Sequence, residues 1–257
     1  MSVATNIYLE YWKTMVLSAD AVTLIQDRVT FFVFTDAPAA VDDFKKQLKN
    51  VEVRAFETLP YRWPDATLLR YQIFDSQIES LNTDLLMHLD ADMQFRFNPW
   101  DRIKGKIEKD LVCLVEHPGY WRPSGKRLVN LYISHPLLYL RDLRLKLIYG
   151  NIGAWERNHS SKAYVKKAKR KKYYCGGTWF GERIAIGKLI RKLKQDVVSD
   201  QKQNLIAIWH DESHLNKWAT ENNYGIETPE LCFFEKYKHL NELTPVIVAV
   251  EKTESTR

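Results

Sequence analysis

Short runs of apolar and β-branched residues alternate along this chain with stretches of helical periodicity. The alternation is typical of an α/β fold, in which the strands of a central sheet alternate with flanking helices. The clearest strands are predicted at 28–35 and 84–91, which contain VTFFVF and LLMHL, and one helix is predicted over 66–81 between them. Further strands are expected at 51–56, 111–115, 173–180 and 245–250, and further helices at 182–198 and 204–221.

Length and composition are those of an ordinary globular protein. The 257 residues allow one large domain or two small ones, and because no repeat or Pro/Gly/Ser-rich linker divides them, we expect a single domain over 1–257. With 45% hydrophobic and 27% charged residues, the composition excludes a disordered, collagen-like or coiled-coil chain. No apolar run reaches the roughly 18 residues of a membrane span, and three cysteines without a CxxC pair favour a reducing compartment. We therefore expect a soluble, cytoplasmic protein.

The segment 123–153 is predicted to be an insertion into this domain. It contains LVNLYISHPLLYLRDLRLKLIYGNIG, which mixes Leu, Ile and Tyr with Arg and Lys, and 137–147 has no strong Gly or Pro punctuation. This pattern predicts an amphipathic basic helix. We interpret it as a helix that packs on its own domain, with docking on a membrane surface or an oligomer contact as the alternatives.

The positive charge of the chain is local. The formal net charge is +6, but the segment 162–172 contributes seven Lys or Arg and no acid, so the remaining residues sum to −1. A local patch is a poor argument for general affinity to nucleic acid, and no nucleic-acid partner is expected. We interpret 162–172 as a solvated loop; attraction to an anionic acceptor, or to the inner face of a membrane that carries it, is the alternative.

The first motif with chemistry is the pair Asp90 and Asp92, which follows the apolar run LLMHL. Carboxylates at i and i+2 lie on the same side of an extended backbone, and the carboxyl end of a strand opens into the crevice where α/β sheets bind ligands. Mg²⁺ and Mn²⁺ prefer such oxygen ligands together with a substrate phosphate. Because DxD is frequent by chance, solvated turn carboxylates remain the alternative.

The segment 209–217, WHDESHLNK, is dense in functional groups. His210 and His214 are four residues apart and share a helix face, which raises a zinc-hydrolase interpretation with Asp211 as general base. That pattern departs from HExxH, because Glu212 stands at the wrong position and no third ligand is evident. A solvated helix face is the structural alternative.

A third motif, YYCGGTWFG at 173–181, places paired glycines inside an aromatic strand. Glycine there indicates the close approach of another backbone or a ligand, and a β-bulge is the alternative. It is no phosphate loop: GxxxxGK[ST] and GxGxxG are absent from the chain, which disfavours a P-loop NTPase and a standard dinucleotide binder.

Together and in order, five segments resemble glycosyltransferase family 6, the family of the histo-blood-group A and B transferases and the α-1,3-galactosyltransferases. The resemblance covers nearly the whole chain apart from roughly 123–153, and it rests on VFTDAPAAV at 33–41, DADMQFR at 90–96, HPGYW at 117–121, YYCGGTWFG at 173–181 and WHDESHLNK at 209–217.

The resemblance implies a GT-A fold, a single Rossmann-like α/β domain with a central mixed sheet flanked by helices. It also implies transfer of GalNAc or Gal from a UDP-sugar to the 3-hydroxyl of a galactose-type glycan, with retention of configuration. The acceptor is expected to be fucosylated or lipid-linked. Because Asp90 and Asp92 are both retained, the resemblance implies dependence on Mn²⁺ or Mg²⁺, which would neutralise the diphosphate leaving group.

The resemblance also assigns roles to single residues. Glu212 matches the catalytic carboxylate, which acts either as a nucleophile or as a stabiliser of an oxocarbenium-like species during same-face attack. Asp211 would hold donor-sugar hydroxyls, His210 would lie near the β-phosphate, and Arg70 would order the donor sugar and the neighbouring aspartate.

Four further positions carry over from the resemblance. On the donor side, Tyr8 would stack on uracil and Lys252 would close over the pyrophosphate. On the acceptor side, His117 would bind a hydroxyl and Trp209 would offer an aromatic face to the sugar. Tyr8 and Trp209 are alternatively core aromatics, and His117 a satisfied histidine before a turn.

Donor choice is expected to depend on the glycine motif. The family's discriminating positions fall at Cys175 and Gly177, on either side of Gly176, which is also expected to line the donor site. A small residue at Gly177 leaves room for an acetamido group, which favours UDP-GalNAc over UDP-Gal. Ala154 replaces an acceptor-contacting threonine, so the acceptor is not fixed by the resemblance.

Two functions of other classes remain as alternatives. One is a zinc-dependent hydrolase that uses His210, His214 and Asp211, and the other is a basic nucleic-acid-binding protein that uses 162–172. Neither accounts for the five ordered segments.

Overall fold

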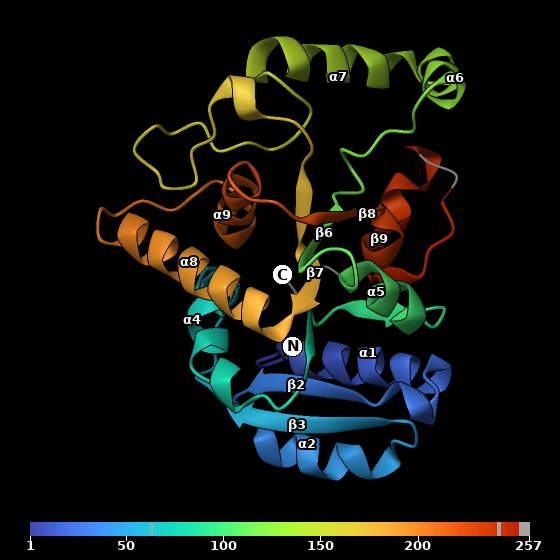
Figure 1. Cartoon of the computed structure of the whole chain (residues 1–257), viewed down its shortest axis with the longest axis vertical. Helices are drawn as coiled ribbons and strands as arrows, with labels where there is room; N and C mark the ends of the chain where they lie inside the picture. Colours follow the sequence, from blue (N-terminus) through green and yellow to red (C-terminus); the bar gives the residue numbers. More distant parts are fainter. Residues whose placement is uncertain (63, 241–242, 252–257) are drawn as a thin grey trace.

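A mixed β-sheet runs through the middle of the molecule (Figure 1). The computed structural model describes residues 1–62, 64–240 and 243–251. One parallel sheet has the order β1-β2-β3, and a mixed sheet has the order β4-β7-β6-β8. The strands span β1 (Ser2–Val3), β2 (Val29–Thr35), β3 (Val51–Glu57), β4 (Leu85–Leu89), β5 (Met93–Phe95), β6 (Val112–Glu116), β7 (Tyr174–Glu182), β8 (Gly225–Glu227), β9 (Phe233–Phe234) and β10 (Ile247–Ala249).

The backbone of Met1 joins the two sheets. Its nitrogen donates to the carbonyl of Met87 at 2.6 Å, and the N–H of Leu89 donates to the carbonyl of Met1 at 3.1 Å. Consequently β1 lies beside β4, and the two sheets form one continuous layer. The small sheet β5-β10-β9 is separate from this layer.

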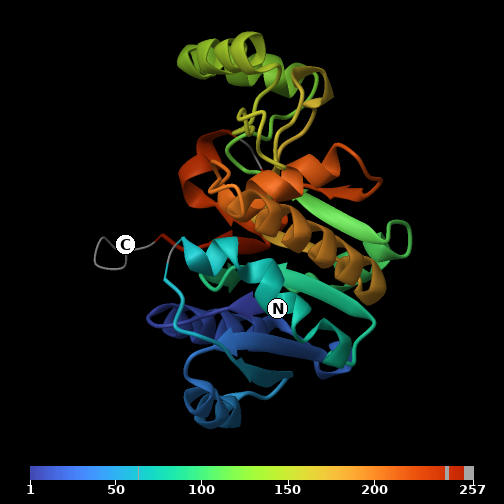
Figure 2. The same cartoon turned by 90° about the vertical axis from the view of Figure 1, so that its left-hand side faces the viewer.

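Helices cover both faces of the central layer, and a core lies under each (Figures 1 and 2). One core packs residues of α1, α2 and α5 against the strands, and the other packs residues of α4, α8 and α9. The helices span α1 (Tyr8–Val22), α2 (Pro38–Phe44), α3 (Asp65–Leu68), α4 (Arg70–Asp75), α5 (Trp100–Ile107), α6 (Lys126–Ser134), α7 (Pro136–Tyr149), α8 (Arg183–Gln201) and α9 (His210–Ala219). The predicted α/β class, with a mixed sheet flanked by helices, is confirmed. In the described part of the chain, helices of membrane-spanning length and apolarity are absent.

Two of the predicted helices are corrected by the structure. The single helix expected over 66–81 is divided into α3, α4 and a 3₁₀ turn at Ile78–Ser80, because the backbone bends at Leu69. The helix expected over 204–221 begins only at His210. α8 ends at Gln201, a turn that contains Asn204 at φ 55° follows, and the next residues form an irregular connection before α9 begins. Helical periodicity identified these segments, but it missed both breaks.

The segment predicted as an insertion contains α6 and α7, which lie at one end of the molecule (Figures 1 and 2). Asp142 of α7 is buried and anchors this end, because the Nε of Arg122 lies 2.6 Å from one of its carboxylate oxygens. The guanidinium of Arg141 donates to the same carboxylate and to the carbonyl of Gly119. A helix is therefore confirmed over 137–147, where Asp142 pairs with the buried side chain of Arg122 and with the exposed Arg141. The predicted amphipathic pattern is wrong, because apolar side chains of α7 lie on opposite faces of the helix.

Candidate active site

The DxD motif lies where β4 ends, at the centre of the molecule. β4 pairs antiparallel with β7 so that Leu89 is opposite Thr178, and beyond this pair the N–H of Asp90 donates to the carbonyl of Gly177 at 2.9 Å. The carbonyl of Asp92 accepts the N–H of Val250 at 2.8 Å, which ties the segment to β10. Backbone hydrogen bonds on both sides therefore position the two carboxylates.

Arg70, the first residue of α4, connects this motif to α9. Its guanidinium lies 2.9 Å from a carboxylate oxygen of Asp90 and 3.1 Å from one of Asp211, and it donates to the carbonyl of Gly176 at 3.3 Å. Burial opposes its charge, but the carboxylates of Asp211 and Asp90 raise the pKa of Arg70 above its ordinary value. The break at Leu69 starts α4 at this arginine, which is 5% exposed.

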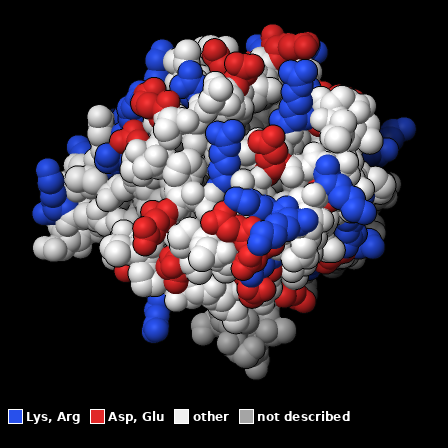
Figure 3. All heavy atoms as spheres, turned by 90° about the horizontal axis from the view of Figure 1, so that it is seen from below, with Lys and Arg blue, Asp and Glu red and all other residues white. Residues whose placement is uncertain are grey.

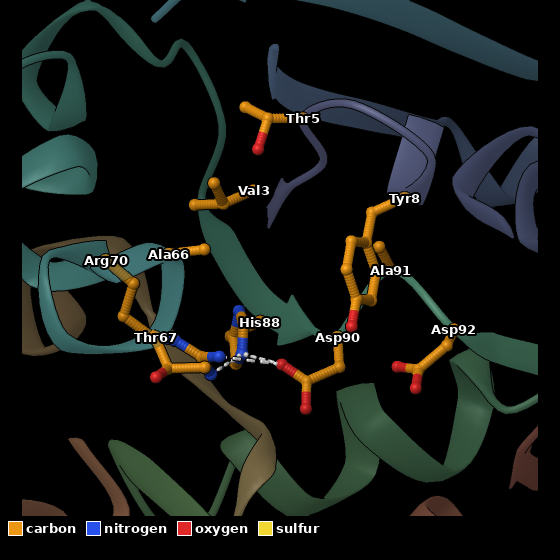
Figure 4. A pocket seen from close by; sticks show the side chains of 10 residues that line it. All are labelled: Val3, Thr5, Tyr8, Ala66, Thr67, Arg70, His88, Asp90, Ala91 and Asp92. Atoms are coloured by element: carbon orange, nitrogen blue, oxygen red, sulfur yellow. Dashed lines mark hydrogen bonds and ion pairs between the residues drawn. The ribbon is translucent and has the colours of Figure 1, made fainter. Parts of the chain in front are cut away.

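His88 supports this arrangement from within β4 (Figure 4). Its Nε2 lies 2.7 Å from the guanidinium of Arg70, and its Nδ1 lies 3.1 Å from the carbonyl of Met1. Burial, aided by the charge of Arg70, lowers the pKa of His88 to about 4. The neutral ring therefore donates from Nδ1 and accepts at Nε2, and this fixes the guanidinium beside Asp90.

The N-terminal turn of α9 carries the second pair of acids. Trp209 precedes the helix, and His210 adopts a left-handed conformation at φ 43°, which is uncommon for a residue other than glycine. Asp211 and Glu212 follow in the first turn, where the helix dipole favours negative charge. The strained residue at the start of the helix therefore directs two adjacent carboxylates toward the ends of β4 and β7.

Glu212 is held against the paired glycines. A carboxylate oxygen accepts the N–H of Gly176 at 2.8 Å, and the Tyr173 hydroxyl is a second hydrogen-bond partner. The side chain of Asn216 locks α9 to β7, because it bonds both backbone groups of Tyr174 at 2.8 Å and also donates to the carbonyl of Glu212. Burial is the main reason that the pKa of Glu212 rises to about 7.

Asp211 has a different environment from its neighbour. Burial raises its pKa to about 6, and the charge of Arg70 opposes that rise. Its backbone carbonyl accepts the hydroxyl of Tyr71 at 3.3 Å. Two adjacent acids thus have distinct surroundings: Asp211 is ion-paired, whereas Glu212 is hydrogen-bonded to neutral groups. This is the kind of arrangement that separates a binding carboxylate from a reactive one.

The two glycines permit these approaches. A Cβ on Gly176 would lie 3.0 Å from the Cβ of Glu212, and a Cβ on Gly177 would lie 2.7 Å from Oδ2 of Asp90. The interpretation of the paired glycines as a place of close approach is therefore confirmed, and the β6–β7 pairing is also irregular here, as the β-bulge alternative expected.

A methyl group at Gly177 should weaken the metal site without unfolding the protein. In Gly177→Ala the Asp90 carboxylate must rotate away, a change that the end of a side chain makes at little cost to folding. We expect Mn²⁺ binding in the presence of UDP, measured by isothermal titration calorimetry, to weaken at least about 10-fold, since even the loss of a residue that only orients a metal ligand costs on the order of 10- to 100-fold. Gly105→Ala is the matched control, because its Cβ meets nothing within 4 Å; equal binding by both variants would contradict this account.

Of the two acceptor-side candidates, His117 lies beside Tyr173 and Tyr120. The ring centre of His117 is 5.9 Å from that of Tyr173 and 4.8 Å from that of Tyr120. Burial lowers the pKa of His117 to about 4, and its Nδ1 accepts the N–H of Gly119 at 3.0 Å. The neutral ring therefore carries its hydrogen on Nε2, where it can donate to a hydroxyl. Trp209 is 51% exposed and offers a free aromatic face.

The remaining predicted residues have different positions. Tyr8 lines the same pocket as Arg70 and the DxD motif, and Figure 4 shows its ring beside Asp90. The imidazole of His210 lies 3.3 Å from the Thr67 hydroxyl, which also lines this pocket. Cys175, by contrast, is 4% exposed and packs in the apolar core. Lys252 lies outside the described residues.

The structure does not support the zinc-hydrolase alternative. His210 faces Thr67, whereas His214 is buried with its Nε2 3.7 Å from a carboxylate oxygen of Asp200. Asp200 is itself bonded to the Ser161 hydroxyl, in a buried network that joins α8 and α9 to the loop near 161. Among the residues that the structure describes, no three His, Cys, Asp or Glu side chains gather as metal ligands. His214 therefore has a structural role.

The DxD site suits a hard divalent cation that also binds a substrate phosphate. Asp90 and Asp92 supply carboxylate oxygens, the type of ligand that Mg²⁺ and Mn²⁺ prefer. One oxygen of Asp90 pairs with Arg70, and the other faces the space that a Cβ on Gly177 would fill. Asp90 and Asp92 would hold such an ion, which would neutralise the negative charge of a bound phosphate.

Sequence reasoning missed three residues of this site. Tyr173 and Asn216 lie within the matched segments 173–181 and 209–217, but their contacts with Glu212 depend on how α9 meets β7. His88 lies in the apolar strand LLMHL. The only sequence signal of its role is that a histidine buried in such a strand needs a hydrogen-bond partner.

Comparison with known proteins places the chain in a family. The model of glycosyltransferase family 6 matches residues 2–129 and 150–256. The chain belongs to glycosyltransferase family 6. The unmatched residues, 130–149, lie within the segment 123–153, whose status as an insertion stays a prediction. The GT-A fold expected from the resemblance agrees with the architecture above.

Relatives within family 6 come from animals and bacteria. The chain is 27% identical over 222 residues to the histo-blood group ABO system transferase 2 of Rattus norvegicus, an alignment that covers 84% of this chain and 56% of the rat protein. It is 24% identical over 226 residues to the globoside alpha-1,3-N-acetylgalactosaminyltransferase 1 of Homo sapiens (85% of this chain and 55% of the human protein). It is 27% identical over 259 residues to the O-antigen biosynthesis glycosyltransferase WbnI of Escherichia coli (98% and 94%). The chain thus spans about half the length of these animal relatives and nearly all of the bacterial one.

Proposed function

We propose that this chain is a retaining α-1,3-glycosyltransferase that depends on Mn²⁺ or Mg²⁺. It would move GalNAc or Gal from a UDP-sugar to a galactose-containing glycan, which is fucosylated or lipid-linked. The observation that carries the proposal is Arg70: it pairs with Asp90 of the DxD motif and with Asp211, the neighbour of Glu212. This pairing supports a proposal in which the DxD motif would hold the diphosphate and the nearby buried Glu212 would be the reactive carboxylate.

The donor would lie along this cleft. Tyr8 would cover the uracil, and Asp90 and Asp92 would hold the cation, which when bound supplies charge neutralisation to the departing diphosphate. Asp211, already oriented by Arg70, would accept hydrogen bonds from the sugar hydroxyls. Family membership supports this assignment, as do the names of the relatives: a histo-blood group ABO system transferase, a globoside alpha-1,3-N-acetylgalactosaminyltransferase and an O-antigen biosynthesis glycosyltransferase.

Glu212 would act at the anomeric carbon of the donor sugar. Its ionised form is the reactive one, and the Gly176 N–H and the Tyr173 hydroxyl hold its carboxylate in place. Glu212 fits either mechanism: its carboxylate can form a covalent glycosyl-enzyme, or it can stabilise an oxocarbenium-like species. His117, which lies beside Tyr173, would orient the acceptor hydroxyl, and the exposed Trp209 would contact the sugar ring.

A transfer assay tests this function directly. The protein is incubated with Mn²⁺, with UDP-GalNAc or UDP-Gal, and with galactosides that do or do not carry a 2-linked fucose. We expect UDP release and an acceptor mass gain of one sugar, a higher kcat/KM with UDP-GalNAc, and loss of both signals in EDTA. Transfer that EDTA leaves undiminished would contradict the metal role of Asp90 and Asp92, and no UDP release from either donor would contradict the function.

A further inference from the structure

Positive charge is concentrated at the end of the molecule that carries α6 and α7. Residues 117–172 contain fourteen Lys or Arg and two acids, a net charge of +12. Since the whole chain carries +6, all other residues together carry −6. Twelve of the fourteen basic residues are exposed, whereas both acids, Asp142 and Glu156, are buried. By contrast, the opposite end, seen in Figure 3, shows acidic and basic side chains intermixed.

The helix α7 is apolar on two opposite faces. Its inner face contains the buried Asp142 and three half-buried residues, Leu138, Leu145 and Tyr149. Its outer face carries Leu137, Leu140, Leu143, Leu147 and Ile148, which are 80%, 56%, 38%, 74% and 42% exposed. A soluble surface helix normally has a polar outer face, and a helix that is apolar all round normally lies in an apolar environment. The apolar side chains on the outer face of α7 therefore lack the apolar surroundings that such side chains normally have.

The outer face of α7 is accessible, and the helix is anchored to the rest of the molecule. α7 lies across the end of the molecule in two perpendicular views, with no other described element beyond it (Figures 1 and 2). On the neighbouring α6, Val129 and Ile133 add 57% and 74% exposed side chains at i and i+4. Because Asp142 and Arg122 anchor α7 from below at 2.6 Å, the apolar face needs no rearrangement to be presented.

Basic residues lie within and beside the apolar face. The exposed Arg144 lies among the outer apolar side chains, one helical turn from Leu140 and from Ile148, and the exposed Lys146 lies beside them on α7. The basic segment 162–172 reaches the C-terminal end of α7, because a Cβ on Gly150 would lie 3.0 Å from the side chain of Lys167. Exposed aliphatic side chains with a rim of lysine and arginine are the signature of peripheral membrane binding.

We propose that the outer faces of α6 and α7, together with the segment 162–172, form a docking surface for an anionic lipid bilayer. A bilayer accepts the aliphatic side chains at its interface, and its anionic headgroups complement the lysines. A second copy of this chain would bring the same positive charge to the contact, and nucleic acid would leave the leucines exposed. This proposal does not depend on the transferase function.

Vesicle flotation without donor or acceptor tests the surface. We expect the protein to bind phosphatidylcholine vesicles that contain 30% phosphatidylglycerol and to bind pure phosphatidylcholine at least about 10-fold more weakly. Leu140→Glu/Leu147→Glu should lower the partition coefficient at least about 10-fold. The control is Ile25→Glu/Ile184→Glu, at positions with 72% and 56% exposure against 74% and 56% for Leu147 and Leu140; it should bind as the unmodified protein does.

A separate variant tests the basic residues of the docking surface, because the leucine variant tests only its apolar face. Neutralising Lys166, Lys167 and Lys169 to Gln should lower binding about 100-fold at low salt. Equal binding to neutral and anionic vesicles, or equal binding by the leucine variant and its control, would overturn the proposal. A dimer that is seen in analytical ultracentrifugation and that the leucine variant abolishes would also overturn it. The same holds if duplex DNA displaces the protein from vesicles and the leucine variant still binds that DNA. Because the assay contains no sugar nucleotide, its failure would leave the transfer assay unaffected.

Discussion

Replacing Glu212 by Gln is expected to lower kcat for sugar transfer by about 10³-fold, because under the proposed function it removes the buried carboxylate that acts at the anomeric carbon of the donor. Gln keeps the size of the side chain and can still accept the N–H of Gly176, which lies 2.8 Å from the carboxylate. Donor binding should therefore change little, since the groups that hold the diphosphate are untouched. The measurement is steady-state transfer together with UDP binding by calorimetry.

The same variant should be more stable than the unmodified protein at high pH. Burial raises the pKa of Glu212 from 4.5 to about 7, so between these pH values the folded state holds a proton that the unfolded state has lost. Protonation of Glu212 therefore contributes stability that is fully present below about pH 4.5 and is lost as the pH rises through 7. Above pH 7 the folded protein bears the full penalty of a buried charge, roughly 3 kcal/mol, which Gln removes. We expect Tm in EDTA to rise on the order of 5–10 °C at pH 8 and not at pH 4.5.

Glu221→Gln is the control for both measurements. Glu221 follows α9, its side chain is 41% exposed, and it pairs at the surface with Lys217. A surface pair of this kind contributes about 1 kcal/mol or less, so neither kcat nor the pH dependence of Tm should change. A Glu212→Gln variant that retains more than about a tenth of the activity, with unchanged Tm at pH 8, would exclude the reactive role of Glu212.

Replacing Asp92 by Asn should remove most of the metal-dependent activity, by about 10²-fold or more. Asp92 is the better probe of the cation site than Asp90, because Asp90 also pairs with Arg70 at 2.9 Å and its loss would disturb that buried guanidinium. The variant should need a higher Mn²⁺ concentration for half-maximal transfer, and UDP should bind more weakly in Mn²⁺ but equally in EDTA.

Asp43→Asn provides the matched control for this variant. Asp43 is 84% exposed in α2 and pairs only at the surface, with Lys46. Its replacement should leave the Mn²⁺ dependence unchanged. If Asp92→Asn also keeps the Mn²⁺ dependence and transfer rate of the unmodified protein, the DxD motif does not hold the cation.

Local patterns predicted those parts of the site that depend on local structure. The run LLMHL predicted a buried strand, and the strand places Asp90 and Asp92 at its carboxyl end, as expected. The paired glycines predicted a close approach, and Glu212 and Asp90 are the groups that approach. In both cases a few consecutive residues were enough for the prediction.

Contacts between distant segments could not be predicted in the same way. Arg70 reads as one polar residue in a helix over 66–81, and nothing local indicates that the helix breaks at Leu69 to bury its guanidinium. The start of α9 depends on the left-handed backbone of His210, which periodicity does not encode. Cys175 alternates with Tyr174 along β7, and only the packing of the sheet shows that it faces the core.

The most direct test of the account is the configuration of the product. With UDP-GalNAc, Mn²⁺ and a galactoside acceptor, ¹H NMR of the product is expected to show a new α-linked sugar on the 3-hydroxyl, and none in EDTA or with Glu212→Gln. A β-linked product would show inversion, and it would contradict the role assigned to Glu212 even if the donor site were correct.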